Sequence, residues 1–514
     1  MLGVSIPIGY PCLRPLILRD SYSRHALYVL LLTFLCYTLY HASRKPISVV
    51  KGVLHAAEFS GDNAGDKSVG WKPFDQENWS QLIGGLEYIY LLVYAVSMVT
   101  SGYVAERINL RHFLAFGMLL SGLTNIAFGF AYYCGIHNYL YFFCVQVLSG
   151  VTQASGWPAV VTLMGNWWGK TRRGFIMGLW NAHTSVGNIL GSLVAGYFAD
   201  SDWGAAFAVP GIMLIVGGLV VYCTLIDRPE RLQLPGRFTR PPHLSLPNSK
   251  STVESSCLPK RPSSDRLEEL PCQSNTTTTT KQAIGLCDAL RLPNVLAYSI
   301  LLFFAKLVSY TFLYWLPNYL VVVEPGTVTA EQAAQLSVLF DLGGIVGGIL
   351  AGWLSDPKES DSDTMTIWRR AFMCSVMLSL AAPLLIAYQA LASAGSTTSL
   401  VLLFCCGLTV NGPYALITTA VSADLGTQHA LQGRARALAT ITAIIDGTGS
   451  LGAALGPFLT GILVPFGWSA VFLMLLTSDL LALTTSLWIV CRSRRSTVKP
   501  SFLDARLKYT TLRP

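Results

Sequence analysis

The chain has 514 residues, of which 52% are hydrophobic and only 12% charged, and its formal net charge is +8. A soluble core does not need many separate apolar runs of about 20 residues, so this composition excludes a soluble globular protein and indicates a polytopic membrane protein. The basic charge does not imply a nucleic-acid partner, because its distribution along the chain is explained by membrane topology.

Twelve apolar segments are predicted to cross the membrane as helices. They are 25–50, 81–105, 112–134, 138–165, 173–199, 205–226, 293–321, 331–355, 368–391, 397–423, 433–464 and 468–491. The first segment is not followed by a small-residue cleavage site, so we interpret it as a span and not as a removed signal peptide. The predicted fold class is an all-α membrane protein with two six-helix halves.

The spacing of these segments also predicts the domain organisation. The predicted parts are a cytosolic N-terminus over 1–24, a six-helix half over 25–226, a largely disordered cytosolic linker over 227–292, a second six-helix half over 293–491 and a cytosolic tail over 492–514. The linker prediction rests on the segment 229–283, whose Pro, Ser, Thr and charged residues cannot bury enough apolar surface to fold alone.

The positive charges predict the orientation of the chain in the membrane. Of the 36 Lys and Arg residues, three lie within spans and three in the first outward loop. The other 30 fall on one side if both termini and the linker are cytosolic. The positive-inside rule therefore predicts cytosolic termini and accounts for the basic charge.

Arg44 and Lys45 are adjacent cations inside the first predicted span. A charged side chain near the bilayer midplane costs about 2.5–3.5 kcal/mol or more, and it usually faces a polar cavity. The pair therefore indicates a site for an anion. The alternative is a helix end with both side chains snorkelling to the headgroups, although apolar residues continue through Val50.

The two predicted halves repeat one pattern, Gly-x-x-x-acid, after the second and the eighth span. The copies, Gly102 with Glu106 and Gly352 with Asp356, are 250 residues apart. The arginines that follow the two acids are Arg107, Arg111, Arg369 and Arg370. We expect each glycine to let the second and third helices of its half approach closely. The acids and arginines are expected to form a cytosolic charge latch that breaks and re-forms as the halves rock, as in the major facilitator architecture.

Several long segments resemble one transporter family. They are HASRKPISVVK in the first span, SGWPAVVTLMGNWWGKTRRGFIMGLWNAHTSVGNILG across spans four and five, AKLVSYTFLYWLPNYL in span seven, and NGPYALITTAVSADLG with ATITAIIDGTGSLGAALGP in spans ten and eleven. From about residue 20 to 490 the chain resembles the sugar phosphate exchangers of solute carrier family thirty-seven, nearest to the branch with members one and two. These belong to the organophosphate:phosphate antiporters of the major facilitator superfamily.

The resemblance implies a phosphate clamp. In bacterial relatives two cations from spans one and seven hold the phosphoryl group, and Arg44 matches the first of them. The second position is Ser309 here, so we expect Lys306, one helical turn earlier, to replace it, with Lys45 assisting. The alternative for Lys306 is a structural pair with a buried carboxylate.

Further candidate ligands come from other spans. His183 lies one residue before Thr184, which matches a histidine of the bacterial glycerol-phosphate carrier, and it is expected at the cavity edge or against a neighbouring helix. Asp341 is expected to pair with Lys306 when no anion is bound. Trp157 and Tyr310 are candidates for contact with the sugar, with packing as the alternative.

The predicted function is therefore an antiporter that exchanges a sugar phosphate, foremost glucose-6-phosphate, for inorganic phosphate in the endoplasmic reticulum membrane. Its expected partners are phosphate, phosphate esters and the lipid bilayer, with no nucleic acid. No enzymatic chemistry, cofactor or metal is expected. The alternatives are a carrier of another organic anion, coupled to protons through Asp446 or Asp341, and a membrane scaffold or sensor without transport.

Overall fold

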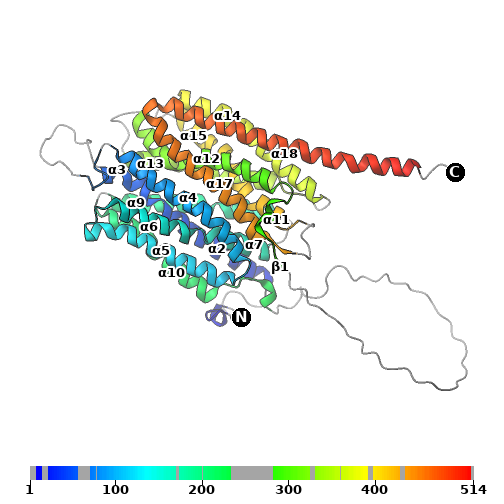
Figure 1. The fold of residues 1–514 in the computed structure, drawn as a ribbon, viewed down its shortest axis with the longest axis horizontal. Helices are drawn as coiled ribbons and strands as arrows, with labels where there is room; N and C mark the ends of the chain where they lie inside the picture. The colour runs from blue at the N-terminus through cyan, green and yellow to red at the C-terminus, as the bar shows by residue number, and fades with distance from the viewer. Residues whose placement is uncertain are drawn as a thin grey trace, which may run out of the picture.

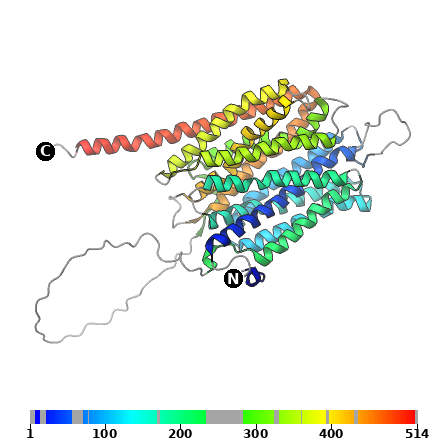
Figure 2. The ribbon, with the colours of Figure 1, turned by 180° about the vertical axis from the view of Figure 1, so that it is seen from behind.

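Long helices run side by side along the molecule in the computed structural model (Figures 1 and 2). The structure describes residues 7–13, 21–55, 70–76, 78–168, 173–199, 201–232, 282–323, 330–358, 361–391, 397–428 and 435–510. The predicted linker therefore lies mostly outside the described residues.

The N-terminal half consists of helices α2 to α10. After the short α1 (Tyr10–Leu13) they are α2 (Tyr22–Arg44), α3 (Pro46–His55), α4 (Trp79–Ala105), α5 (Leu110–Cys134), α6 (Tyr139–Gln153), α7 (Gly156–Trp167), α8 (Arg173–Asn181), α9 (His183–Ala199) and α10 (Trp203–Thr224). The predicted first span divides into α2 and α3 at Lys45, because Pro46 has no backbone N–H and is best placed in the first turn of a new helix.

The C-terminal half consists of helices α12 to α18. They are α12 (Val295–Val323), α13 (Ala330–Leu354), α14 (Asp363–Leu391), α15 (Thr397–Leu416), which continues through a π-helical stretch (Ile417–Val421) into α16 (Ser422–Gly426), α17 (Leu438–Leu463) and α18 (Trp468–Thr510). Before them lies α11 (Leu286–Leu290), and the strands β1 (Gln282–Ala283) and β2 (Ala435–Arg436) pair in parallel. Helix α18 extends well past residue 491, the predicted end of the last span, and projects from the bundle (Figure 1).

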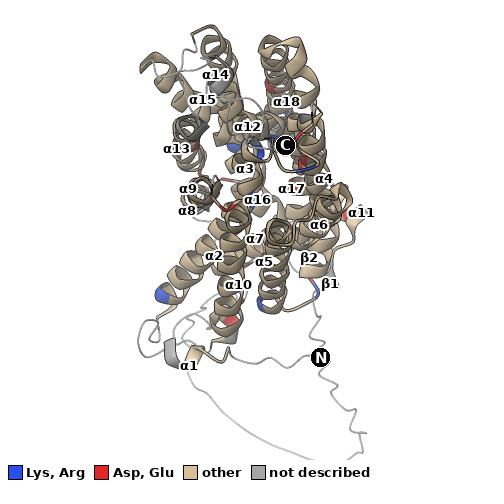
Figure 3. Cartoon of the chain, turned by 90° about the vertical axis from the view of Figure 1, so that its left-hand side faces the viewer, with Lys and Arg blue, Asp and Glu red and all other residues tan. Residues whose placement is uncertain are grey.

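Within the described part of the chain, ten helical segments are long and apolar enough to span a membrane. The two predicted spans outside this set are the fourth and the fifth, because each is divided into two shorter helices, α6 with α7 and α8 with α9. In Figure 3 most of the helical ribbon is tan, and only short stretches have the colours of Lys, Arg, Asp or Glu. Large apolar side chains such as Leu193 and Leu473 face outward, as expected of a surface against lipid.

Glycines allow close helix contacts inside each half. In the N-terminal half α5 packs along α10, and a Cβ on Gly122 would lie 2.5 Å from the Gly211 carbonyl oxygen. In the C-terminal half α13 packs along α15, where Gly343 faces the α15 backbone. Figure 3 separates the two sets, with α2, α5 and α10 on one side and α14, α15 and α18 on the other.

The two halves contact each other through α4 with α17 and through α8 with α13. These pairs correspond to spans two with eleven and five with eight. A Cβ on Gly178 would lie 2.6 Å from the Gly348 carbonyl oxygen, so the second pair meets backbone to backbone.

The glycines of the repeated pattern face these same contacts. A Cβ on Gly102 would lie 2.7 Å from the Ala439 carbonyl oxygen, and Gly352 faces the backbone of Gly174. The prediction that they bring together the second and third helices of one half is therefore wrong. Helical periodicity does not tell which neighbour a small residue faces, and here the neighbour belongs to the opposite half.

Candidate substrate-binding site

Arg44 ends α2 and points into the interior. Its Nε donates a hydrogen bond of 2.6 Å to Oε1 of Gln153, and its guanidinium carbon lies 4.8 Å from the ring centroid of Tyr94. The Nη2 atom is buried and has no hydrogen-bond partner among the described residues. Although α2 ends here, α3 continues the span, so the arginine is held inside the bundle with free donor capacity.

Gln153 is the residue that positions Arg44. It is 1% exposed, its Oε1 also accepts a 2.8 Å hydrogen bond from Tyr90, and its Nε2 lies 3.4 Å from Oγ of Ser43. Sequence reasoning missed it. The available signal was an amide within an apolar span, immediately before the break between α6 and α7.

Lys45 connects the two halves near Arg44. Its Nζ donates a 3.1 Å hydrogen bond to the carbonyl oxygen of Leu313 in α12, and the side chain is buried. A carbonyl satisfies one of the three ammonium donors and leaves the charge uncompensated by this contact.

Lys306 pairs with Asp446 across the contact between α12 and α17. Its Nζ lies 2.7 Å from Asp446 Oδ1 and 3.2 Å from Ser450 Oγ, and both charged residues are buried. The expected pairing of Lys306 with Asp341 is not what the structure contains, because Asp341 accepts a 3.3 Å hydrogen bond from Asn188. The geometry instead matches the alternative considered for Lys306, a pair with a buried carboxylate.

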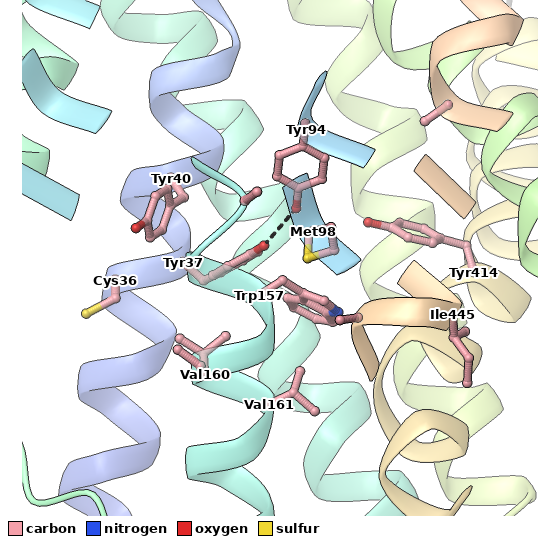
Figure 4. Packing of buried hydrophobic residues seen from close by; sticks show 14 of the residues in the cluster. Cys36, Tyr37, Tyr40, Tyr94, Met98, Trp157, Val160, Val161, Tyr414 and Ile445 are labelled. Atoms are coloured by element: carbon pink, nitrogen blue, oxygen red, sulfur yellow. Dashed lines mark hydrogen bonds between the residues drawn. The ribbon is translucent and has the colours of Figure 1, made fainter. Parts of the chain in front are cut away.

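An aromatic cluster lies beside Arg44, where the two six-helix halves contact each other (Figure 4). The hydroxyl groups of Tyr37 and Tyr94 are 3.5 Å apart, with Met98, Trp157 and Tyr414 around them. Trp157 is 4% exposed, and its Nε1 has no partner within the described ranges.

His183 belongs to the same cluster and does not line the cavity between the halves. Its ring lies 4.9 Å from that of Tyr37 and 4.6 Å from that of Trp180, and its Nδ1 is 3.2 Å from Oγ1 of Thr184. Thr184 lines the cavity instead.

The cavity between the halves is lined from both sides. Its polar lining includes His41, Asn181, Asn188, Ser309, Asp341 and Asn411. Tyr310 also lines it, with its ring edge-on to that of Tyr414 at 6.2 Å. The Ser309 hydroxyl, at the position where bacterial relatives carry a cation, is buried and unpartnered in the described part of the structure.

The acids of the repeated pattern each cap a helix of the opposite half. Asp356 accepts backbone hydrogen bonds from Gly174 (2.6 Å) and Phe175 (3.0 Å) at the start of α8. Glu106 Oε1 accepts a 2.7 Å bond from the backbone N–H of Ala439 at the start of α17. A carboxylate at a helix N-terminus satisfies orphan N–H groups and opposes the positive end of the helix dipole. We call the end of the bundle with these caps the latch end.

Arg370 joins the cap of α8 to a second ion pair. It is 1% exposed and lies 3.2 Å from both Asp356 Oδ1 and Asp424 Oδ2. Arg173, at the start of α8, also lies 3.2 Å from Asp424. Asp424 thus connects an arginine of each half. Sequence reasoning did not include Arg173 in the latch, because its partner is 251 residues away.

The other predicted latch arginines lie elsewhere. Arg107 is exposed and donates a 2.7 Å hydrogen bond to the Tyr103 carbonyl of its own helix. Arg369 pairs at 2.7 Å with Asp361 inside the C-terminal half. Arg111 is buried near the start of α5. The expectation that Arg107 and Arg369 bridge to the repeated acids therefore differs from the structure, where Arg107 bonds a carbonyl of its own helix and Arg369 pairs with Asp361.

At the opposite end Lys51 connects the halves. Its Nζ lies 3.4 Å from Glu87 Oε1 in α4 and 3.2 Å from the carbonyl oxygen of Tyr314 in α12. We call this the Lys51 contact. Together with the latch, it places contacts between the halves at both ends of the central site.

Helices from two similar halves, joined at both ends around an interior arginine, define a membrane transporter of the major facilitator type. A comparison with protein-family models agrees, since residues 33–443 match the Major Facilitator Superfamily.

Comparison with individual proteins narrows the assignment. The chain is 46% identical over 473 residues to glucose-6-phosphate exchanger SLC37A2 of Mus musculus, covering 90% of this chain and 91% of the relative. It is 47% identical to human SLC37A2, with the same coverage, and 44% identical to human glucose-6-phosphate exchanger SLC37A1, covering 90% and 92%. The chain belongs to this SLC37 family of exchangers.

Proposed function

We propose that this protein exchanges glucose-6-phosphate for inorganic phosphate across the endoplasmic reticulum membrane by alternating access. The observation that carries the proposal is Arg44, which is held inside the bundle by Gln153 while its Nη2 has no partner in the described residues. A guanidinium can bind phosphate through two parallel hydrogen bonds, and both substrates carry a phosphoryl group.

Lys45 and Lys306 complete the proposed clamp. Lys45 adds a charge next to Arg44. Lys306 is neutralised by Asp446, so it contributes when its ammonium turns from this carboxylate toward the bound anion. The pair with Asp446 lowers the cost of burying the Lys306 ammonium, because a buried charge without a partner is expensive.

Obligatory exchange follows from the same electrostatics. Arg44 and Lys45 make no ion pair among the described residues, so closing the site around them without an anion is costly. The halves rock readily when phosphate or its ester is bound. A loaded carrier therefore returns with the other substrate, which is antiport.

The distribution of positive charge supports placing both termini and the latch end in the cytosol. The Lys51 contact then faces the lumen. The resemblance to sugar phosphate exchangers favours the endoplasmic reticulum as the membrane.

The test uses purified protein in phosphate-loaded liposomes. Uptake of radiolabelled glucose-6-phosphate should depend on internal phosphate and should be competed by external phosphate. Counterflow with other organic anions but not with phosphate would overturn the proposal in favour of a different anion carrier. Failure of every anion in the panel to bind would favour a scaffold or sensor.

A further inference from the structure

A second polar pocket lies inside the N-terminal half, and Arg44 is part of its lining. Its polar lining includes Arg44, Glu87, Asn125, Gln146, Ser149 and Gln153. These side chains come from α2, α4, α5 and α6. We propose that this pocket binds the hydroxyl groups of the sugar phosphate while Arg44 holds the phosphate. The inference rests on the proposed function and deepens it.

The pocket contains polar groups that the protein itself does not satisfy. Gln146, which lines the pocket, is 8% exposed. Glu87 Oε2 and Arg44 Nη2 are buried and have no hydrogen-bond partner among the described residues. An unsatisfied buried polar group costs about 1–3 kcal/mol, so two of them around one space indicate a ligand that supplies the partners.

The chemistry of the lining selects hydroxyl groups. Gln146 offers an amide donor and acceptor, Ser149 a hydroxyl and Glu87 a carboxylate acceptor, and a sugar hydroxyl can both donate and accept. Glu87 Oε1 is paired with Lys51 at 3.4 Å, so Glu87 Oε2 is the oxygen that remains to accept a hydrogen bond from a sugar hydroxyl. The arginine and the carboxylate therefore orient a sugar phosphate, with its charged end at Arg44 and its polyol toward Gln146.

The location of the pocket suits a carrier that must keep its ligand while it rocks. Every residue that lines the pocket belongs to the N-terminal half except Tyr314 of α12. The hydroxyl contacts and Arg44 therefore move as one body. The cavity between the halves, lined by both Asn188 and Asn411, changes shape when the halves move.

The test compares two exchange reactions of the same variant in proteoliposomes. In Gln146→Leu we expect exchange of glucose-6-phosphate for phosphate to fall about tenfold, because hydrogen bonds to the sugar are lost. Phosphate-for-phosphate exchange should stay within about twofold of wild type, since inorganic phosphate has no polyol. Glycerol-3-phosphate, with fewer hydroxyl groups, should show a smaller loss.

Gln389→Leu is the matched control, because Gln389 is a glutamine of α14 that bonds Ser469 far along the chain from the pocket. Both exchange reactions should be unchanged in it. If Gln146→Leu loses phosphate exchange too, Ser149→Ala is measured instead, with its melting temperature as the check on folding.

Equal loss of the two reactions in folded Ser149→Ala, or no loss of sugar phosphate exchange in folded Gln146→Leu, would overturn the polyol pocket while leaving the proposed function intact. Wild-type protein that exchanges phosphate but no sugar phosphate would instead overturn the proposed function, and the pocket assignment with it.

Discussion

The side chain of Arg44 is fixed before any anion arrives. Gln153 binds its Nε at 2.6 Å, and the rings of Tyr94 and Tyr37 lie 4.8 and 5.9 Å from its guanidinium carbon. Such preorganisation reduces the entropy lost on binding. It also fixes the direction of the guanidinium edge that has no hydrogen-bond partner among the described residues. A snorkelling arginine would point toward the headgroups, whereas Arg44 points into the interior.

Arg44→Ala is therefore expected to reduce phosphate exchange at least about 100-fold, since two charge-assisted hydrogen bonds are lost. Arg44→Lys should recover little, because one ammonium cannot replace a planar fork. Radiolabelled phosphate uptake into phosphate-loaded liposomes at matched protein levels measures both. Arg24→Ala, which removes an exposed arginine of the same helix, is the control. Exchange above half of wild type in Arg44→Ala would contradict the clamp.

The Lys306–Asp446 pair makes a second prediction at this scale. Lys306→Met alone should destabilise the protein by about 3–5 kcal/mol, because it leaves a buried carboxylate unpaired. Adding Asp446→Leu should restore most of the stability. The double variant should still exchange phosphate at least about tenfold more slowly, since the clamp lacks one cation.

Melting temperature in detergent and phosphate uptake are measured on the same preparations of these variants. Recovery of both stability and exchange in the double variant would show that the pair is structural only. It would remove Lys306 from the clamp.

At the scale of elements, one arrangement occurs twice. The acid after α4 caps α17, and the acid after α13 caps α8, so each half holds the first turn of a helix in the other. The equivalence follows from the internal repeat, since a contact from the first half to the second has a counterpart from the second to the first. Both caps lie at one end, which is why they can act together as a latch.

Asp356→Asn should weaken the cap of α8 and leave Arg370 with one fewer charged partner. We expect turnover to slow about tenfold, with little change in phosphate affinity, because the latch is separate from the residues that line the Arg44 pocket. Phosphate titration and exchange rates on the same purified variant provide the two readings. Asp361→Asn, whose partner Arg369 is in its own half, is the matched control. A loss of affinity in proportion to rate would place Asp356 in binding or folding.

At the scale of the whole molecule, the latch and the Lys51 contact hold the halves together at opposite ends. The two ends share one rigid-body motion, so weakening either contact should shift the population toward opening at that end. The size of this population shift depends on how much free energy the weakened contact had contributed to one state over the other. It does not depend on which residue provides that contact.

Lys51→Met and Asp356→Asn should therefore act in opposite directions. The reporter is a cysteine at Asn411, which lines the cavity between the halves, in a background without native cysteines. A membrane-impermeant maleimide should label it at least about threefold faster from the Lys51 side in Lys51→Met, and faster from the latch side in Asp356→Asn. Lys72→Met, which removes an exposed lysine at the Lys51 end, should change neither rate. Changes in the same direction in both variants would contradict rocking about a central site.

The sequence by itself determined the helical class, the approximate spans, and the places of Arg44 within the first span and of the two repeated acids. In the hydrocarbon core of the bilayer, a helix satisfies the backbone N–H and C=O groups internally, so long apolar segments form helices. A charged residue within such a segment requires a polar site. The same reasoning could not divide spans four and five, because hydropathy does not register a break inside an apolar run.

Only the tertiary structure decided which groups meet. It paired Lys306 with Asp446 and not Asp341, aimed Glu106 and Asp356 at the first turns of α17 and α8, and brought Gln146 and Gln153 beside Arg44. The periodicity of a helix tells which residues share a face, but the partner of that face depends on the rotation and neighbour of each helix. Contacts between residues more than 100 positions apart set that rotation, and no local pattern in the chain encodes it.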